Sequence, residues 1–328
     1  MATRPHEAPA PAQAVGIVVV LTVVLAVIFV AFALPATKSA PRDVPIGVAG
    51  PPPAITAIES GLARNAPGSF AVTTYDDRDS LADAIRNREV YGGLSAGPQG
   101  PTLLLATGAS PMVAQALTQL GTAMAQNTGM PLHTEDLAPL PGGDPRGVGL
   151  AAAALPLTLA ALLPAIALVV LFNGRPGLQT TTMIGFAAVA SLTVTALLRY
   201  LFGSIEQHFW GVTAALFVGI TATGLALLGL GALFGRVGLG LGAAAAILLG
   251  NPLSGINSAP ELLPGGWGAF GQLLPQGANA TLLRSAAYFG DSFPDQRAST
   301  ALVVLGCWAA AGALMIAVAW LRQRRSRA

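Results

Sequence analysis

The sequence predicts an α-helical polytopic membrane protein with six spans and a small α/β extracytoplasmic domain inserted between spans 1 and 2. The chain has 328 residues, of which 53% are hydrophobic and only 10% are charged, and its mean hydropathy is +0.63. Such a composition is typical of membrane proteins. Six apolar runs approach the ~20 residues that a helix needs to cross a bilayer. Most acidic residues lie between the first two runs, which indicates a polar domain there.

The first apolar run, residues 14–34, follows a short tail at residues 1–13 and predicts the first transmembrane helix. A signal peptide cleaved near Ala36 is the alternative. The apolar core of about 20 residues is longer than the 7–15 residues usual in signal peptides, which favours an uncleaved anchor. The remaining five spans fall in a transmembrane domain at residues 148–328. They are expected at residues 148–172, 182–201, 211–234, 237–250 and 299–321.

The region between the first two spans, residues 35–147, has the pattern of a small α/β domain. Segments rich in β-branched and apolar residues alternate with segments of helical periodicity, which favours a sheet covered by helices over a β-sandwich. A region of this size can hold one hydrophobic core. Strands are expected at residues 44–50, 70–76, 91–97, 101–108 and 133–140, and helices at residues 54–66, 80–90 and 111–126.

The distribution of basic residues predicts the orientation in the membrane. Arginines near span ends concentrate on the cytoplasmic side of membrane proteins. If the tail at residues 1–13 is cytoplasmic, the same side receives Arg175, Arg236 and the basic C-terminal tail RQRRSRA. Six spans then place both termini in the cytoplasm. The tail could also form a nucleic-acid or lipid-binding patch, but its position beside a span favours a topological anchor, so no nucleic-acid partner is expected.

The composition also predicts the cellular location of the protein. It is rich in Ala, Gly and Arg and has one lysine, Lys38, which is typical of a GC-rich bacterial genome. The expected location is therefore the bacterial plasma (inner) membrane, with the lipid bilayer as the surroundings of all six spans.

Several enzyme and cofactor classes are excluded by what the sequence contains. No GxxxxGK[ST] motif precedes Lys38, so the chain is not expected to bind ATP. The three histidines, His6, His133 and His208, are scattered and give no metal-site spacing. Residues 93–97, GLSAG, match the hydrolase pattern GxSxG, but GPQGPT follows in place of the required helix. The chain is therefore not expected to be an enzyme, and no cofactor is expected in it.

The predicted spans contain no carboxylates. Glu206, Glu261, Asp291 and Asp295 all fall in loops that the topology places outside. Ion-coupled carriers usually keep an ionisable group at mid-membrane, where the coupling ion binds. This argues against a secondary transporter.

Four segments together carry a resemblance to a known family. They are DVPIGVAG at residues 43–50, TTYDDRDSLADAIRNREVYGGLSA at 73–96, PLPGGDPRG at 139–147 and GNPLSGINSAPELLPGGWGAFGQLLPQGANATLLRSAAYF at 250–289. In this order and spacing, the chain resembles the ABC-2 type transporter permeases over nearly its whole length. The resemblance is to the phage-infection-protein-like subgroup, which has a large extracytoplasmic domain after the first span.

The resemblance implies that residues 251–290 form a broken outer re-entrant segment. Such a segment enters the outer leaflet as short helices and returns, which is tolerated where protein or a water-lined cavity satisfies the backbone. The alternative is an amphipathic segment that lies flat on the outer surface. The residues that suit breaks in the backbone or the membrane interface are Asn251, Pro252, Pro260, Pro264, Trp267, Phe270 and Pro275.

The resemblance further implies that the loop between spans 2 and 3 contacts an ATPase. The candidate coupling residues are Asn173, Gly174, Arg175 and Pro176. The family usually has a small helix here, whereas this loop is short and rich in Gly and Pro. Arg175 is the best candidate contact, although it could be only a topology charge. ATPase coupling is thus implied by the likeness to the family and by no docking motif in the loop.

The function that the resemblance implies is that of a membrane-spanning permease subunit of an ABC-type exporter. A separate cytoplasmic ABC ATPase and a second permease copy, in a homodimer or heterodimer, are the expected partners. The substrate is expected to be hydrophobic or amphipathic, because the spans offer few polar side chains. The alternative is a non-transporting envelope membrane protein whose extracytoplasmic domain binds a secreted or surface partner.

Overall fold

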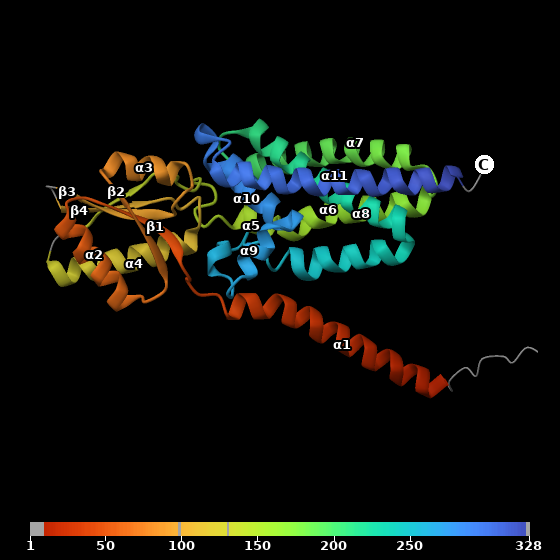
Figure 1. The fold of residues 1–328 in the computed structure, drawn as a ribbon, viewed down its shortest axis with the longest axis horizontal. Helices are drawn as coiled ribbons and strands as arrows, with labels where there is room; N and C mark the ends of the chain where they lie inside the picture. Colours follow the sequence, from red (N-terminus) through yellow and green to blue (C-terminus); the bar gives the residue numbers. More distant parts are fainter. Residues whose placement is uncertain (1–9, 98–99, 130, 326–328) are drawn as a thin grey trace, which may run out of the picture.

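The computed structural model describes residues 10–97, 100–129 and 131–325 and consists of a small sheet with its helices beside a helical bundle (Figure 1). Within the described residues, five helices are long and apolar enough to cross a membrane, which indicates a membrane protein. They cover Gln13–Thr37, Val148–Leu171, Pro176–Leu201, Phe209–Gly250 and Gln296–Arg325.

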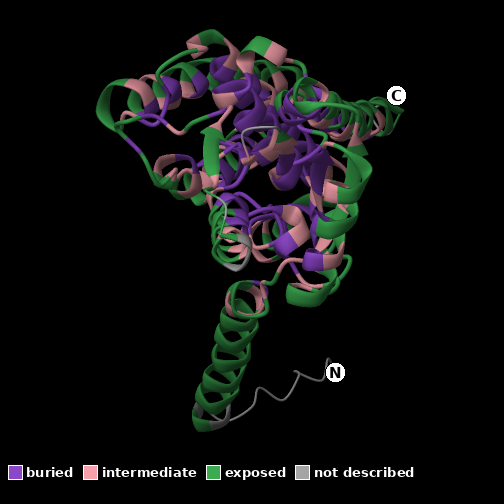
Figure 2. Ribbon diagram, turned by 90° about the vertical axis from the view of Figure 1, so that its left-hand side faces the viewer, coloured by how far each residue is buried: buried purple, intermediate pink, exposed green. Residues whose placement is uncertain are grey.

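Helix α1, Ala10–Thr37, slopes away from the rest of the bundle (Figure 1). None of its most apolar window is buried inside the chain. Figure 2 shows the same helix exposed along almost its whole length. Lipid or another polypeptide must therefore cover an apolar surface that this chain leaves open.

The sheet has five strands in the order β2-β1-β3-β4-β5. Neighbouring strands are parallel, except for the antiparallel pair β3–β4. This mixed sheet confirms the expectation of strands alternating with helices, with boundaries shifted by a few residues. The strands are β1 Val44–Ala49, β2 Phe70–Tyr75, β3 Gly92–Gly97, β4 Gly100–Leu105 and β5 His133–Asp136.

Helices cover both faces of the sheet. Helix α3, Arg78–Arg86, begins at a capping box in which Asp77 accepts from the backbone N–H of Ser80 at 2.8 Å, and the Ser80 hydroxyl accepts from the N–H of Asp77. It covers one face, with Leu81 fully buried. Helices α2, Pro52–Asn65, and α4, Pro111–Thr128, lie on the opposite face (Figure 1).

The bundle is built around the long helix α8, Phe209–Ala245, which packs against α6, α7, α10 and α11. The short α5, Val148–Ala152, leads into α6, Ala154–Leu171. Helix α7, Pro176–Ala196, ends in a π-helical turn, η1, at Leu197–Leu201, and α11 covers Gln296–Arg325.

Helix α8 reverses direction at Gly235, whose φ of 65° and ψ of −149° are not helical. The arms before and after this residue pack against each other: a Cβ on Gly242 would lie 2.7 Å from Cδ1 of Leu230 and 3.0 Å from Cδ2 of Leu227. In a straight helix Leu227 and Gly242 would be ~22 Å apart at 1.5 Å per residue. Glycine is suited to this turn because it adopts positive φ without a Cβ clash.

The expected fourth and fifth spans, residues 211–234 and 237–250, both fall on this one element. The structure therefore gives five candidate spans among the described residues, where the sequence predicts six. The physical reason is that Gly235 alone separates the two arms. The second arm and its terminal π turn η2, Ala246–Gly250, are also shorter than the ~20 residues that a span needs.

The segment expected at residues 251–290 connects the two parts of the molecule. It forms short helices: η3 Pro260–Leu262, α9 Trp267–Gln272 and α10 Pro275–Tyr288, followed by η4 Gly290–Ser292. Ala259, Leu262 and Phe289 belong to the hydrophobic core of the sheet. Leu282 and Leu283 of α10 belong to the core of the bundle. The segment is therefore packed into both cores, and α10 is a buried helix.

Candidate functional site

A group of polar side chains lies in the interior of the apolar bundle. Thr158 comes from α6, Thr223 from α8, and Gln276 and Asn279 from α10. Asn251 directly follows the π turn η2, and its backbone N–H donates to the carbonyl of Ala246 at 3.1 Å. Together they line a cavity of about 20 Å³, enough for about one water molecule. We call these five side chains the polar cluster.

Two glycines on neighbouring helices create the space for its amide groups. A Cβ on Gly219 of α8 would lie 2.1 Å from Cγ of Asn279. A Cβ on Gly250 would lie 2.2 Å from Oε1 of Gln276. Both distances are far below van der Waals contact, so any larger residue would force the amides to move. The polar cluster therefore depends on these glycines as much as on the polar residues themselves.

The polar cluster has hydrogen-bonding capacity that the described residues do not use. The Thr158 hydroxyl donates to Oδ1 of Asn251 at 2.8 Å. Nδ2 of Asn251, Nε2 of Gln276 and Oδ1 of Asn279 are buried and have no hydrogen-bond partner in the described part of the chain. Buried polar atoms are normally paired, because an unpaired one costs roughly 1–3 kcal/mol. These two donors and one acceptor can therefore bind water or a polar group of a ligand.

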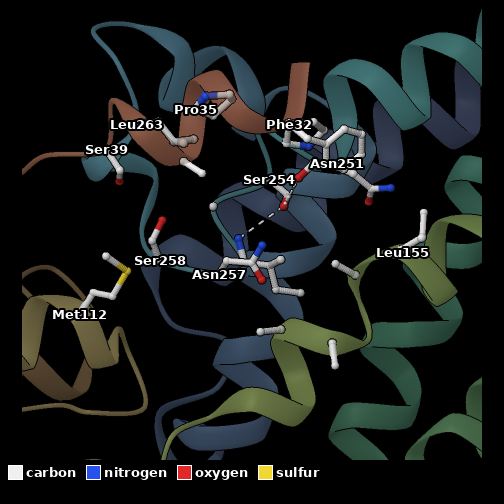
Figure 3. A pocket seen from close by; sticks show the side chains of 17 residues that line it. Phe32, Pro35, Ser39, Met112, Leu155, Asn251, Ser254, Asn257, Ser258 and Leu263 are labelled. Carbon is white, nitrogen blue, oxygen red and sulfur yellow. Dashed lines mark hydrogen bonds between the residues drawn. The ribbon is translucent and has the colours of Figure 1, made fainter. Parts of the chain in front are cut away.

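A larger pocket of about 400 Å³ adjoins the polar cluster and separates α1 from the bundle. Figure 3 shows Phe32 and Pro35 of α1, and Ser39 just after this helix, on one side and Leu155 of α6 on the other. Seven of the eight residues from Asn251 to Ser258 also line it, all except Leu253. The pocket and the small cavity share Ala154, Asn251, Ser254 and Ile256 in their linings. We call it the outer pocket.

A second polar group joins the sheet to the bundle. Arg297 of α11 donates through Nη1 to Oε1 of Glu261 and to the Tyr91 hydroxyl, both at 2.9 Å. It also donates through Nε to the carbonyl of Arg88 at 2.9 Å. Tyr91 donates to Oε2 of Glu261 at 2.7 Å. Tyr91 and Arg88 precede β3, Glu261 lies in η3 and Arg297 lies in the first turn of α11. These hydrogen bonds therefore connect three segments that are distant in the sequence. We call this group the seam cluster.

Burial of the seam cluster changes the protonation behaviour of two groups in the sheet part. Tyr91 is almost fully buried, and loss of hydration raises the pKa of its hydroxyl to about 12. Burial likewise lowers the pKa of the Arg88 guanidinium to about 10, with a further decrease from the nearby charge of Arg297. The Arg88 guanidinium lies 5.2 Å from the ring centroid of Phe289. At neutral pH the arginine is charged and the tyrosine neutral, as their hydrogen bonds require.

The candidate coupling loop lies at the end of the bundle farthest from the sheet (Figure 1). Asn173, Gly174 and Pro176 line a cavity of about 140 Å³ together with Gly235 of the α8 turn and Trp320 of α11. Arg175 is exposed and precedes the first residue of α7. The structure thus brings the loop, the α8 turn and the C-terminal end of α11 together.

The residues expected in the broken outer segment take different places. Asn251 and Pro252 line the outer pocket, and Asn251 also belongs to the polar cluster. Pro260 and Pro275 each occupy the first position of a helix. Proline is tolerated there, because a backbone N–H at this position would have no partner within the helix. The other three lie apart from both clusters: Pro264 precedes α9, and Trp267 and Phe270 are 37% and 49% exposed on it.

Sequence reasoning missed most of the residues that the structure brings together. Gln276 and Asn279 lie within QGANATLL, which reads as part of a broken connection, and Thr158 is one threonine in an apolar run. Arg88 and Arg297 lie 209 positions apart and carry no pairing signal. The signal that the sequence did contain was four prolines and five glycines between Asn251 and Pro275, in a segment that is otherwise mostly apolar.

Comparisons with protein-family models, curated proteins and solved structures found no match to this chain. Among residues 10–97, 100–129 and 131–325, no group of three His, Cys, Asp or Glu side chains is placed to hold a metal ion.

Proposed function

We propose that this chain is the membrane-spanning permease subunit of an ABC-type exporter. The observation that carries the proposal is the polar cluster, which leaves buried donors and an acceptor unpaired inside an apolar bundle and adjoins the outer pocket of about 400 Å³. Polar groups at membrane depth are costly and generally line a pathway or a binding site. The resemblance of four sequence segments to ABC-2 type permeases supports the same function.

The proposed topology has six crossings, with the two arms of α8 as the fourth and fifth. The second arm is short, but residues 251–288 continue it as broken helices packed into the bundle. The sheet then lies outside the cytoplasm, and both termini lie inside. The basic ends support this orientation. The loop between α6 and α7, the α8 turn and the C-terminal end of α11 line one cavity at the end of the molecule opposite the sheet (Figure 1), and these segments carry Arg175, Arg236 and Arg322. The membrane would be the inner membrane of a bacterium.

The energy for transport would come from a separate cytoplasmic ATPase, because the sequence has no phosphate-binding loop. Its docking place would be the candidate coupling loop with the adjoining α8 turn. ATP binding and hydrolysis would shift two permease copies between inward- and outward-facing states. The uncovered surface of α1 supports a second copy in the bilayer. The substrate would be hydrophobic or amphipathic, because the outer pocket has mostly apolar walls, and its polar side chains are uncharged: Ser39, Asn251, Ser254, Asn257 and Ser258.

The test is to purify the tagged protein from its native host in mild detergent and identify the proteins that accompany it. We expect a stoichiometric P-loop ATPase, and we expect Arg175→Glu to remove it by reversing the charge at the coupling loop. Arg146→Glu is the matched control, because Arg146 is equally exposed but lies before α5 at the opposite end. Repeated absence of an ATPase from the wild-type protein would contradict the proposal.

An alternative function is that of a non-transporting envelope protein whose sheet part binds a secreted or surface partner. The observation in its favour is the loop between α6 and α7. It runs only from Phe172 to Arg175 and has no helix of its own to dock an ATPase. The same purification separates the two functions, because the alternative expects a stable complex with an envelope protein that is indifferent to added nucleotide.

A further inference from the structure

A large apolar hollow lies on the sheet, away from the bundle. It has a volume of about 720 Å³, within the ~300–1,000 Å³ typical of small-molecule sites. Its floor contains Leu94 and Ala96 of β3 and Pro101 of β4. Leu94 and Ala96 are two positions apart, so their side chains lie on the same face of the sheet. We call this hollow the distal groove.

Small residues keep the distal groove open between two helices. Ala54, Ala57 and Gly61 of α2 and Gly121 and Ala125 of α4 line it, together with the larger Ile58, Met124 and Leu132. The small residues are spaced by three or four positions, which puts each set on one side of its helix. Large side chains at these positions would close the gap, as Leu and Ile do elsewhere in the same core. The sequence of α2 and α4 therefore leaves an apolar space that the protein itself does not fill.

One cation lies at the edge of this apolar space. Arg64, near the end of α2, is the only charged residue in the described lining, and its side chain is exposed. It forms no ion pair with a described residue. An apolar slot with a single unpaired cation at its rim matches a molecule with an apolar chain and an anionic end.

We propose that the distal groove binds a single-chain amphiphile with an anionic head group. The chain lies between α2 and α4 on the floor of β3 and β4, and the head group lies beside Arg64. The inference deepens the proposed export function, on which it rests for the view that this amphiphile is the transported cargo. The outer pocket would release the cargo beside α1, and the distal groove would hold it clear of the bilayer.

The experiment uses the full chain in phosphatidylcholine nanodiscs, because detergent would itself occupy an apolar groove. The probe is a dodecanoate with a photoreactive diazirine at the end of its chain, and labelled peptides are identified by mass spectrometry. We expect labelling in α2 and α4. Unlabelled straight-chain carboxylates should compete, with the half-maximal concentration falling about fourfold for each added methylene until the groove is full, since each buried CH₂ contributes ~0.8 kcal/mol.

Three variants make the result specific. Ala57→Trp fills the groove from an exposed position and should reduce labelling of α2 and α4 at least tenfold. Ala63→Trp is its control, because Ala63 is exposed on the same helix but does not line the groove. Arg64→Gln should weaken competition by a carboxylate by roughly two- to fivefold, the range of an exposed ion pair, and leave competition by the alcohol of equal chain length unchanged.

Labelling confined to the bundle, or equal labelling of wild type and Ala57→Trp, would overturn the inference. Its failure is distinguishable from failure of the proposed function. An accompanying ATPase without labelling of the groove would leave the exporter and remove the cargo site. Labelling of the groove without an ATPase would leave an amphiphile-binding envelope protein.

Discussion

The close approach of Gly219 to Asn279 gives a sharp test of the polar cluster. In Gly219→Ala the new Cβ would lie 2.1 Å from both Cγ and Oδ1 of Asn279. Carbon atoms in contact are ~3.5–4.0 Å apart, so the overlap is about 1.4 Å. Asn279 is only 8% exposed and cannot turn into solvent. Overpacking of this kind destabilises a protein by about 1–3 kcal/mol. The higher helix propensity of alanine offsets this by up to about 1 kcal/mol. Because the helix-propensity gain is common to any helical Gly→Ala change, we expect Gly219→Ala to be about 1–3 kcal/mol less stable than such a change with open space around it.

The assay is denaturant unfolding in detergent, with the midpoint compared between variants. Gly185→Ala is the matched control, because Gly185 lies within α7 and no heavy atom comes within 4 Å of the position that its Cβ would take. This control should be neutral or more stable than wild type by up to about 1 kcal/mol. The double variant Gly219→Ala/Asn279→Ala removes the overlap and should lose less stability than the two single changes added together.

Equal stability of Gly219→Ala and Gly185→Ala, or strict additivity in the double variant, would contradict this expectation. The first result would mean that Asn279 moves freely, and the second that the two residues do not touch. Under the proposed function, Gly219→Ala should also reduce transport, because the displaced amide leaves its place in the polar cluster. Gly185→Ala should transport at the wild-type rate.

Three further predictions concern the α8 turn and the seam cluster. Gly235→Ala places a side chain at positive φ and should cost about 1–3 kcal/mol, whereas Gly240→Ala, in the helical arm with open space around it, should not destabilise. Glu261→Gln removes the carboxylate that pairs with Arg297 and so weakens the attachment of η3 to α11. We therefore expect faster amide hydrogen exchange in η3 at neutral pH than in wild type. Tyr91 should titrate near pH 12 in ultraviolet difference spectra. Because its pKa in the folded protein exceeds the ordinary value of 10, its contribution to stability is present below pH 10 and is lost as the pH rises towards 12. Tyr91→Phe should abolish this loss.

The strands and the membrane-length helices could be predicted from the sequence because their signals are local. β1 begins at the expected Val44, and the expected helix at residues 111–126 is α4, with Ser110 as its cap. The boundary between the expected fourth and fifth spans was harder to predict. The run around Gly235 has no polar loop, and only the backbone torsion of that glycine separates the arms of α8.

The polar cluster could not be predicted because it is assembled from contacts remote in sequence. Asn251 was recognised as unusual, yet its hydrogen bond to Thr158 crosses 93 positions. Gly219 looks like one more small residue in an apolar helix, and only the position of α10 gives it a role. The distal groove has the same origin, since an absence of large side chains on two helices has no sequence motif.

Helix α10 ties the sheet part to the interior of the bundle. The Arg88 guanidinium donates to the carbonyl of Thr281 at 3.1 Å and to the Ser285 hydroxyl, whereas Asn279 of the same helix belongs to the polar cluster. The Thr281 hydroxyl donates to Gln272, which in turn donates to the carbonyl of Ser254 in the outer pocket.

A displacement of the sheet that moves Arg88 must therefore break buried hydrogen bonds or carry α10 with it. Breaking them would leave a guanidinium unpaired at 4% exposure, which is costly. Small sliding of packed helices is a known way to accommodate such a displacement. Since Asn279 and Gln276 belong to α10, a shift of this helix would also change the shape of the polar cavity. In an exporter this link would let a cargo outside the membrane influence the pathway within it.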